Sequence, residues 1–219
     1  MLKVIKAGVY DTIQDVGRLG YSIKGINPNG AMDRFALQLA NALVLNNSKE
    51  ATLEMHFPAP VLQFEKDTVI ALTGANFSAL INQTPLLPGK VAFIRRGDIL
   101  SFTKKKWGER CYLTVKGGFD IPLWLDSKST NTKIEMGGFA GRPLQRNDMI
   151  PYAEYSTFNS TQVSKWQVNS NEIYKHQEQI YLLNGPEWDW LDDDSKEKLK
   201  SSARSGKAHH PKILQRNYA

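Results

Sequence analysis

The sequence predicts a mainly β fold of antiparallel strands, with one long helix near the N-terminus. Beyond residue 50, short strand-like runs recur roughly every 8–12 residues, separated by turn residues, which is typical of an antiparallel barrel or sandwich rather than of β-α-β units. Residues 31–45 differ, because their apolar side chains recur at helical spacing and no Gly or Pro interrupts them. We therefore expect a β domain that carries a single long helix.

The same patterns place the elements along the chain. A first strand is expected at residues 2–6, and the helix over 31–45 has Asn29 and Gly30 as candidate caps and Asp33 in its first turn. The strands expected after the helix lie at 52–57, 61–64, 68–73, 78–82, 91–94, 99–103 and 110–115. Towards the C-terminus we expect a weakly patterned connection at 151–178, a strand at 180–188, a short helix at 192–203 and a disordered tail from Arg204.

Two glycine-rich segments, 12–33 and 116–150, interrupt this pattern. Each combines glycines and prolines with polar side chains, and so many breakers would weaken a core strand. We interpret both as ordered loops that present polar groups and bare backbone to a ligand, because functional residues concentrate on loops held by a rigid scaffold. The residues that stand out are Gln14, Asp15, Gly17, Arg18, Gly20 and Asn29 in the first segment, and Gly117, Gly118, Lys128, Ser129, Thr130, Gly138 and Arg142 in the second.

Composition narrows the classes of function. The net charge of +6 is scattered, without the basic stripe and interleaved aromatic residues that a single-strand nucleic-acid binder needs. No apolar run approaches the roughly 20 residues that span a bilayer, and the apolar stretch at the N-terminus is too short for a signal peptide, so we expect a cytoplasmic protein. The single cysteine, Cys111, lies in a strand-like run and is expected to be a buried thiol.

The sequence contains no standard cofactor motif. Neither G-x-x-x-x-G-K-[ST] nor a strand-linked G-x-G-x-x-G is present. The histidines lack the spacing of metal ligands, so no metal site is predicted. Ser129 and Thr130 have no G-x-S-x-G setting, which argues against a hydrolase nucleophile at these positions.

A series of motifs in order along residues 4–187 resembles one known family. They include T-I-Q-D-V-G-R-L-G-Y (12–21), G-I-N-P-N-G-A-M-D (25–33), L-T-G-A-N-F (72–77), Y-L-T-V-K-G-G-F-D-I-P (112–122), G-G-F-A-G-R-P-L (137–144) and N-G-P-E (184–187). Together they resemble the KipA-like family, which includes the PxpC component of the ATP-dependent 5-oxoprolinase, also called allophanate hydrolase subunit 2. The family is related to the A/B part of the carboxyltransferase domain of urea carboxylases.

The chain departs from the family pattern in two places. Where the family usually reads G-S-R-S-T, this sequence has Asp126 in place of the Gly and Lys128 in place of the Arg. Family members also continue through an S-[ND]-R-M-G-Y-R-L segment that this sequence lacks, so it resembles a C-terminally shortened member.

The resemblance implies a cyclophilin-like, largely antiparallel β-barrel with an incomplete second lobe. Residues 1–150 would form the carboxyltransferase A/B-type domain, and 151–219 the connection and the truncated start of the second lobe. The resemblance also implies a complex with two other proteins, the KipI-like PxpB and PxpA. The assembled complex would open the 5-oxoproline lactam to glutamate with ATP, which Mg²⁺ is expected to accompany.

The chemistry of this reaction indicates which groups an active site must supply. Coupling to ATP suggests phosphorylation of the amide oxygen, which needs donors for phosphate oxygens, a cation for developing charge and a carboxylate to orient a metal or proton. We therefore predict Gln14, Asp15, Arg18, Lys128 and Arg142 as catalytic residues, with the glycines, Asn29, Ser129 and Thr130 named above binding substrate or phosphate. The hypothesis is that the two glycine-rich segments face each other across one cleft.

Structural roles compete with several of these assignments. Asp15 and Arg18 could form an ion pair that pins the loop, and Asp33 is better explained as a helix-start residue. Glu54 lies in a strand pattern and either faces solvent or turns into the cleft. His56, beside Phe57 and Pro58, is interpreted as structural.

Three functions are compatible with the sequence. The first is a component of 5-oxoprolinase, and the second is a regulatory protein that sequesters a KipI-like inhibitor of a histidine kinase. The third is a carboxyltransferase-type protein that acts with biotin on a urea-like substrate and depends on partner proteins for the biotin.

Overall fold

A computed structural model describes residues 1–153, 167–169, 173 and 184–202 of the chain. Its contacts divide the chain into two compact units, Met1–Ser170 and Asn171–Ala219. Within the described residues, no helix is long and apolar enough to cross a membrane.

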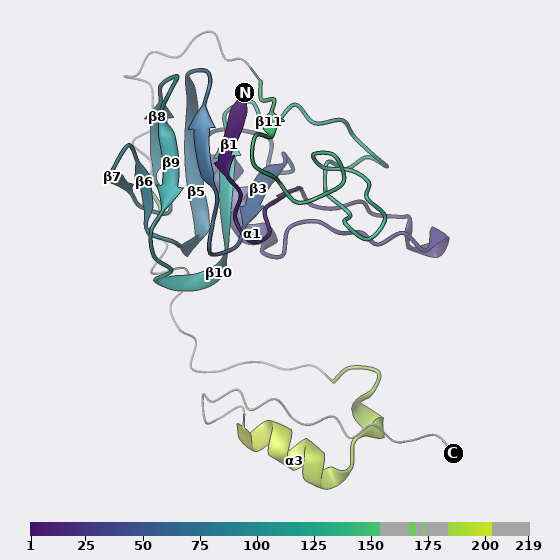
Figure 1. Cartoon of the computed structure of the whole chain (residues 1–219). Coiled ribbons are helices and arrows are strands. Elements are labelled where there is room, and N and C mark those ends of the chain that lie inside the picture. Colours follow the sequence, from purple (N-terminus) through teal and green to yellow (C-terminus); the bar gives the residue numbers. More distant parts are fainter. Residues whose placement is uncertain (154–166, 170–172, 174–183, 203–219) are drawn as a thin grey trace. The chain divides into compact units, whose positions relative to one another are not determined.

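The first unit contains two antiparallel sheets (Figure 1). The six-stranded sheet has the order β11-β1-β4-β9-β6-β7, and the five-stranded sheet has the order β2-β3-β10-β5-β8. The strands of the first sheet are β1 (Leu2–Lys6), β4 (Val61–Phe64), β6 (Ala79–Ile81), β7 (Thr84–Leu86), β9 (Ile99–Phe102) and β11 (Met149–Ile150). Those of the second are β2 (Thr12–Gln14), β3 (Thr52–Met55), β5 (Thr68–Asn76), β8 (Val91–Ile94) and β10 (Trp107–Val115).

One hydrophobic core draws its side chains from both sheets. The six-stranded sheet contributes Leu2 and Phe64, and the five-stranded sheet contributes Leu53, Leu72 and Leu113, all buried. Alternate residues of a strand point to opposite faces, so one face of each sheet can be apolar throughout. The predicted mainly β fold is confirmed; the described strands form two sheets rather than one closed barrel.

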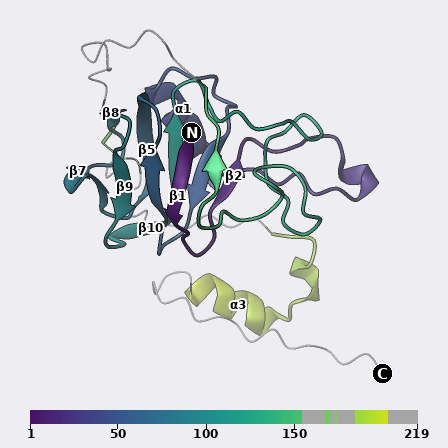
Figure 2. The same cartoon turned by 45° about the horizontal axis from the view of Figure 1, so that its top comes forward.

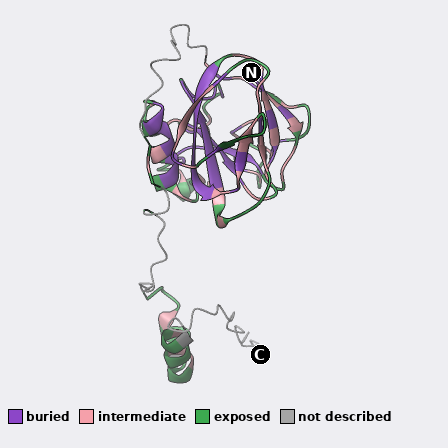
Figure 3. Ribbon diagram, turned by 90° about the vertical axis from the view of Figure 1, so that its left-hand side faces the viewer, coloured by how far each residue is buried: buried purple, intermediate pink, exposed green. Residues whose placement is uncertain are grey.

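Helix α1 (Arg34–Leu43) covers the face of the five-stranded sheet that points away from this core (Figure 3). Hydrophobic side chains such as Leu37, Leu43 and Val69 are buried here, together with polar groups that are hydrogen-bonded. The Thr73 hydroxyl donates to the Ala36 carbonyl at 2.7 Å, and the Thr114 hydroxyl donates to the Asn41 side-chain oxygen at 2.8 Å. Because each of these buried hydroxyls has a partner, the helix is held in one position as well as packed.

The long helix begins later than the sequence predicted. Asp33 is the N-cap, with its carboxylate accepting a hydrogen bond from the backbone of Ala36 at 2.9 Å, so its expected role at the helix start is confirmed. Asn29 and Gly30, expected as caps, lie outside the helix. The backbone around them is instead hydrogen-bonded to the earlier part of the first glycine-rich segment, to which both residues belong.

The strands predicted between residues 2 and 115 are all found, several with shifts at their ends, and three short strands of the first unit were not predicted. β2 lies at the start of the first glycine-rich segment, where the neighbouring glycines concealed it. β7 contains Pro85, which indicated a turn; it is an edge strand, where proline is tolerated. β11 has only two residues and depends on β1 for its pairing.

The two glycine-rich segments lie side by side at one end of the sheets. The loop that carries the short helix η1 (Ser22–Lys24) and the loop that follows β10 run together on the right of Figure 1, and the turned view in Figure 2 shows the same arrangement. The sheets therefore hold both segments on a common scaffold.

The second unit contains the short helix η3 (Trp188–Trp190) and α3 (Asp193–Ser202). The helix predicted at 192–203 is confirmed within the described residues. Of the strand predicted at 180–188, residues 180–183 lie outside the described residues, and the rest forms a turn and the start of η3 rather than a strand. The tail predicted to be disordered from Arg204 also lies outside the described residues.

Candidate functional site

The Asp15 carboxylate joins the two glycine-rich segments. It is buried and accepts hydrogen bonds from the hydroxyls of Ser127 and Ser129, at 2.7 and 2.5 Å, and from the backbone of Lys128 at 2.6 Å. The backbone of Gly17 donates to the same carboxylate at 2.7 Å. One side chain of the first segment thus organises a whole turn of the second.

Arg18 makes the second connection between the segments. Its guanidinium donates to the Ser129 carbonyl and, at 2.9 Å, to the side-chain oxygen of Asn29, and it lies 4.5 Å from the centre of the Trp124 ring. Only 1% of this residue is exposed. Burial lowers the pKa of Arg18, and the negative charge of Asp15 opposes that shift.

The hydrogen-bond partners of Asp15 and Arg18 test two expectations: that these two residues form a local ion pair, and that the two glycine-rich segments come together. The described ion pairs do not include an Asp15–Arg18 pair, so the predicted local ion pair is replaced by bonds from each side chain to the second segment. The segments do come together as predicted, but in direct contact. We call this contact region, centred on Asp15, Arg18 and Ser129, the junction. The catalytic assignment of its residues stays a prediction.

Glycine at position 138 permits the close contact at the junction. Gly138 has a φ of +56°, and a Cβ atom there would overlap the side chain of Thr130. Thr130 is buried, and both its backbone and its hydroxyl donate to the Ile13 carbonyl at 2.9 Å. A residue larger than glycine would therefore push the second segment away from β2.

Gln14 also belongs to the junction. Its side-chain nitrogen donates to the Thr12 hydroxyl at 3.0 Å and to the Thr130 carbonyl at 3.4 Å. Its side-chain oxygen is buried without a hydrogen-bond partner among the described residues. Gly20 differs from these residues, because it is exposed and its α-carbon faces open space.

Arg142 is not brought to the junction. It forms two hydrogen bonds of 2.8 Å with the Asp148 carboxylate, which raise the pKa of Arg142 and lower that of Asp148. The guanidinium also lies 5.9 Å from the centre of the Phe139 ring. These contacts close the loop that leads into β11.

Lys128 connects the junction to a neighbouring pocket. Its backbone donates to Asp15, whereas its ammonium group donates to the Glu50 carboxylate at 2.5 Å and to the Phe119 carbonyl at 2.8 Å. Lys128 and Glu50 are both partly exposed, so this ion pair lies at the edge of the buried region.

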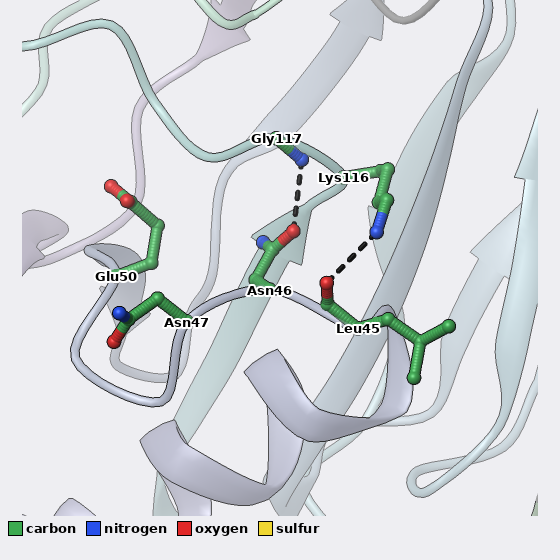
Figure 4. A pocket seen from close by; sticks show the side chains of 6 residues that line it. All are labelled: Leu45, Asn46, Asn47, Glu50, Lys116 and Gly117. Carbon is green, nitrogen blue, oxygen red and sulfur yellow. Dashed lines mark hydrogen bonds between the residues drawn. The ribbon is translucent and has the colours of Figure 1, made fainter. Parts of the chain in front are cut away.

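The pocket next to Lys128 lies between the end of α1 and the end of β10 (Figure 4). It has a volume of about 290 Å³. The Lys116 ammonium donates to the Leu45 carbonyl and the Gly117 backbone donates to the Asn46 side chain, both at 2.9 Å. The lining residues are Leu45, Asn46, Asn47, Glu50, Lys116 and Gly117. Burial lowers the pKa of Lys116.

Gly118 lets Glu50 take its place in the pocket wall. It has a φ of +80°, and a Cβ atom there would lie 2.5 Å from the Glu50 side chain. Of the predicted binding residues, Gly117 lines the pocket, and Gly118 lies next to the lining residue Glu50. Asn46, Asn47, Glu50 and Lys116 were not predicted, although Lys116 directly precedes the glycine pair.

Other ionisable residues in the strands have structural roles. Glu54 is buried and accepts hydrogen bonds from the Tyr112 hydroxyl at 2.7 Å and from the Met32 backbone at 2.9 Å, so it turns inward rather than to solvent. Cys111 is buried as predicted, which raises the pKa of its thiol to about 12. His56 packs edge-on against the Tyr10 ring, in keeping with the structural role expected for it.

Asp11 is a buried carboxylate directly before β2. The Gly8 backbone donates to it at 2.8 Å, and its own carbonyl accepts a hydrogen bond of 2.8 Å from Leu144. Burial raises the pKa of Asp11 to about 7, against which the backbone hydrogen bonds act. Asp11 thereby ties the start of the junction to the loop that carries Arg142.

ATP and Mg²⁺, which the resemblance implies, do not fit the pocket. Its volume is at the low end for ligand sites and suits a molecule much smaller than a nucleotide. Among the described residues that line it, Glu50 is the one carboxylate, and it is already paired with Lys128. Within the described part of the chain, no group of three or more His, Cys, Asp and Glu side chains could hold a metal ion.

The two antiparallel sheets and the joined glycine-rich segments define a carboxyltransferase-like β protein. The model of the family described as carboxyltransferase domain, subdomain A and B, matches residues 24–204, and the chain belongs to this family. The crystal structure of the K. lactis urea amidolyase has a TM-score of 0.69 and 37% sequence identity, covering 73% of this chain and 10% of that chain. The crystal structure of TTHA0988 has a TM-score of 0.67 and 30% identity, covering 72% of this chain and 58% of that chain.

Two kinds of curated relative are similar in sequence. The chain is 39% identical over 151 residues to the C subunit of 5-oxoprolinase from Escherichia coli (strain K12), a match that covers 69% of this chain and 49% of that protein. It is 37% identical over 149 residues to the urea amidolyase of Lachancea kluyveri, a match that covers 68% of this chain and 8% of that protein. The chain thus spans about half the length of the 5-oxoprolinase relative.

Proposed function

We propose that this chain acts as the PxpC component of an ATP-dependent 5-oxoprolinase, together with a KipI-like PxpB and a PxpA protein. The observation that carries the proposal is its similarity to two curated 5-oxoprolinase C subunits, from Escherichia coli and Haemophilus influenzae, at 39% and 35% identity. In each case the matched region makes up about half of the relative, as against 8% of the urea amidolyase.

In this proposal the residues of the two segments have different roles. Asp15 and Arg18 are buried and engaged in holding the second segment, so we assign them positioning roles. Lys128 and Glu50 lie at the edge of the pocket, where a substrate can reach them. Arg142 braces the loop before β11 through Asp148. ATP enters as a co-substrate of the assembled enzyme, with no binding site assigned to this chain.

A biotin-dependent carboxyltransferase is the second candidate function. The similarity to urea amidolyase in sequence and in structure supports it, and a urea-like substrate would also suit a small polar pocket. This function would need a partner that carries biotin.

Reconstitution with PxpA and PxpB distinguishes the candidates. We expect ATP-dependent release of glutamate from 5-oxoproline to require this chain, and omission of the chain is the control. Glutamate release at the same rate without the chain would reject the first proposal. Carboxylation of urea in the presence of a biotinylated partner, without glutamate release, would support the second.

A further inference from the structure

We propose that the pocket formed by Leu45–Asn47, Glu50, Lys116 and Gly117 binds a small molecule that carries one carboxylate and one amide N–H. Lys116 would receive the carboxylate, and Glu50 would accept the hydrogen bond from the N–H. The choice of 5-oxoproline as the ligand rests on the proposed function. The size and charge of the ligand follow from the pocket itself.

The charges around the pocket favour a monoanion. Lys116 lines it, and Lys128 lies 2.5 Å from the lining residue Glu50. A carboxylate of the ligand would meet the Lys116 ammonium at one end of the pocket. A second carboxylate would lie near Glu50, where like charges repel.

Lys116 gains most from such a ligand. The residue is buried to about nine-tenths, and its ammonium donates to the Leu45 carbonyl at the end of α1. Burial disfavours the charged form of an amine, so a carboxylate placed beside it would offset part of that cost. A charge-assisted hydrogen bond is also stronger than one between neutral groups.

Glu50 is prepared to accept a hydrogen bond. The described hydrogen bonds of its carboxylate, from the Lys128 ammonium and the Ala51 backbone, both go to Oε1. Oε2 therefore retains acceptor capacity for a ligand N–H. Glu50 and Lys116 lie at opposite ends of the group in Figure 4, with the Asn46–Gly117 bond between them, which suits a ligand with two different polar ends.

Titration of the purified chain tests this inference without the other proteins of the complex. The probes are L-5-oxoproline, 2-pyrrolidinone, which lacks the carboxylate, and acetate, which lacks the N–H. We expect saturable binding of L-5-oxoproline by calorimetry and at least tenfold weaker binding of the other two. Equal binding of 2-pyrrolidinone, or no saturable binding of L-5-oxoproline up to millimolar concentrations, would overturn the inference.

Variants locate the binding in the pocket. Lys116→Met should weaken L-5-oxoproline binding at least tenfold, whereas Lys104→Met, at an exposed lysine of another loop, should leave it unchanged. Lys116→Gln keeps a hydrogen-bond donor and serves if the methionine variant fails to fold. Unchanged affinity in a folded Lys116 variant would overturn the inference.

The two proposals can fail separately. Glutamate release that requires this chain but is unaffected by Lys116→Met would reject the pocket and keep the proposed function. Binding of L-5-oxoproline that depends on Lys116, with no requirement for the chain in glutamate release, would do the reverse.

Discussion

The second glycine-rich segment contributes to both the junction and the pocket, but the carboxylates that it contacts there differ in how many hydrogen bonds they receive. At the junction, the Asp15 carboxylate receives four hydrogen bonds from within the chain and is buried. In the pocket, Glu50 keeps an oxygen available, and the Lys128 side chain that holds it is partly exposed. A polar group saturated by its own protein stabilises the fold, whereas one with spare capacity can recognise a ligand. Residue type alone therefore did not distinguish positioning residues from binding residues.

Replacement of Asp15 should have the largest effect on stability. Asp15→Ala would leave buried donors from Ser127, Ser129 and Lys128 without an acceptor, each a costly loss. We expect the free energy of unfolding, measured with urea, to fall by about 3 kcal/mol or more. Asp120→Ala is the matched control, since Asp120 is exposed, its backbone is not in the left-handed region, and the described side-chain hydrogen bonds and ion pairs do not involve it. A loss no larger than that of the control would contradict the role assigned to the junction.

The pH dependence of stability should report on Asp11, which lies directly before β2 at the start of the junction. Its pKa is about 7 in the folded protein, against the ordinary value of 3.8 expected in the unfolded chain, so the folded state holds the proton more tightly. The resulting stabilisation is complete below pH 3.8 and is lost as the pH rises through 7, by at most about 4 kcal/mol.

Asp11→Asn isolates this contribution. The free energy of unfolding of the wild type, less that of the variant, should decrease between pH 4 and pH 8. A difference that stays constant over this range would show that Asp11 titrates normally.

A methyl group at Gly118 should affect the pocket more than the fold. Gly118→Ala strains a backbone with φ of +80° and displaces Glu50, so we expect about 1–2 kcal/mol of destabilisation and roughly tenfold weaker binding of L-5-oxoproline. Gly20→Ala is the control for backbone strain, because Gly20 has φ of +89° but faces open space. If the two variants bound L-5-oxoproline equally well, Glu50 would have no role in ligand recognition.

Replacement of Arg142 should change least. Its ion pair with Asp148 is partly exposed, and such pairs contribute little to stability. We expect Arg142→Ala to cost about 1 kcal/mol or less and to leave the affinity for L-5-oxoproline unchanged. Circular-dichroism melting curves and calorimetry measure both quantities. A loss of affinity for L-5-oxoproline would show that Arg142 belongs to the binding site, as the sequence predicted.

The strands were largely predictable because their signal is local. Alternation within a short run sufficed for β4 and β8, which were predicted with their observed ends. β2 was not predictable in this way, since its three residues become a strand by pairing with Thr52–Glu54, far away in the sequence.

The candidate site was predictable only in outline. Glycines beside polar side chains indicated the two segments, and the structure does bring them together. The pocket depends on the turn after α1 meeting the turn after β10, a long-range contact that no local pattern describes. Asn46 and Asn47, which directly follow the helix predicted at 31–45, were therefore not predicted as site residues.

One NMR titration tests the division between junction and pocket most directly. With L-5-oxoproline added to the ¹⁵N-labelled chain, we predict saturable amide shifts at Asn46, Asn47 and Gly117. We predict little change at Gly17, Ser129 and Thr130 in the junction. Shifts concentrated on the junction amides, with the pocket amides unmoved, would contradict this division.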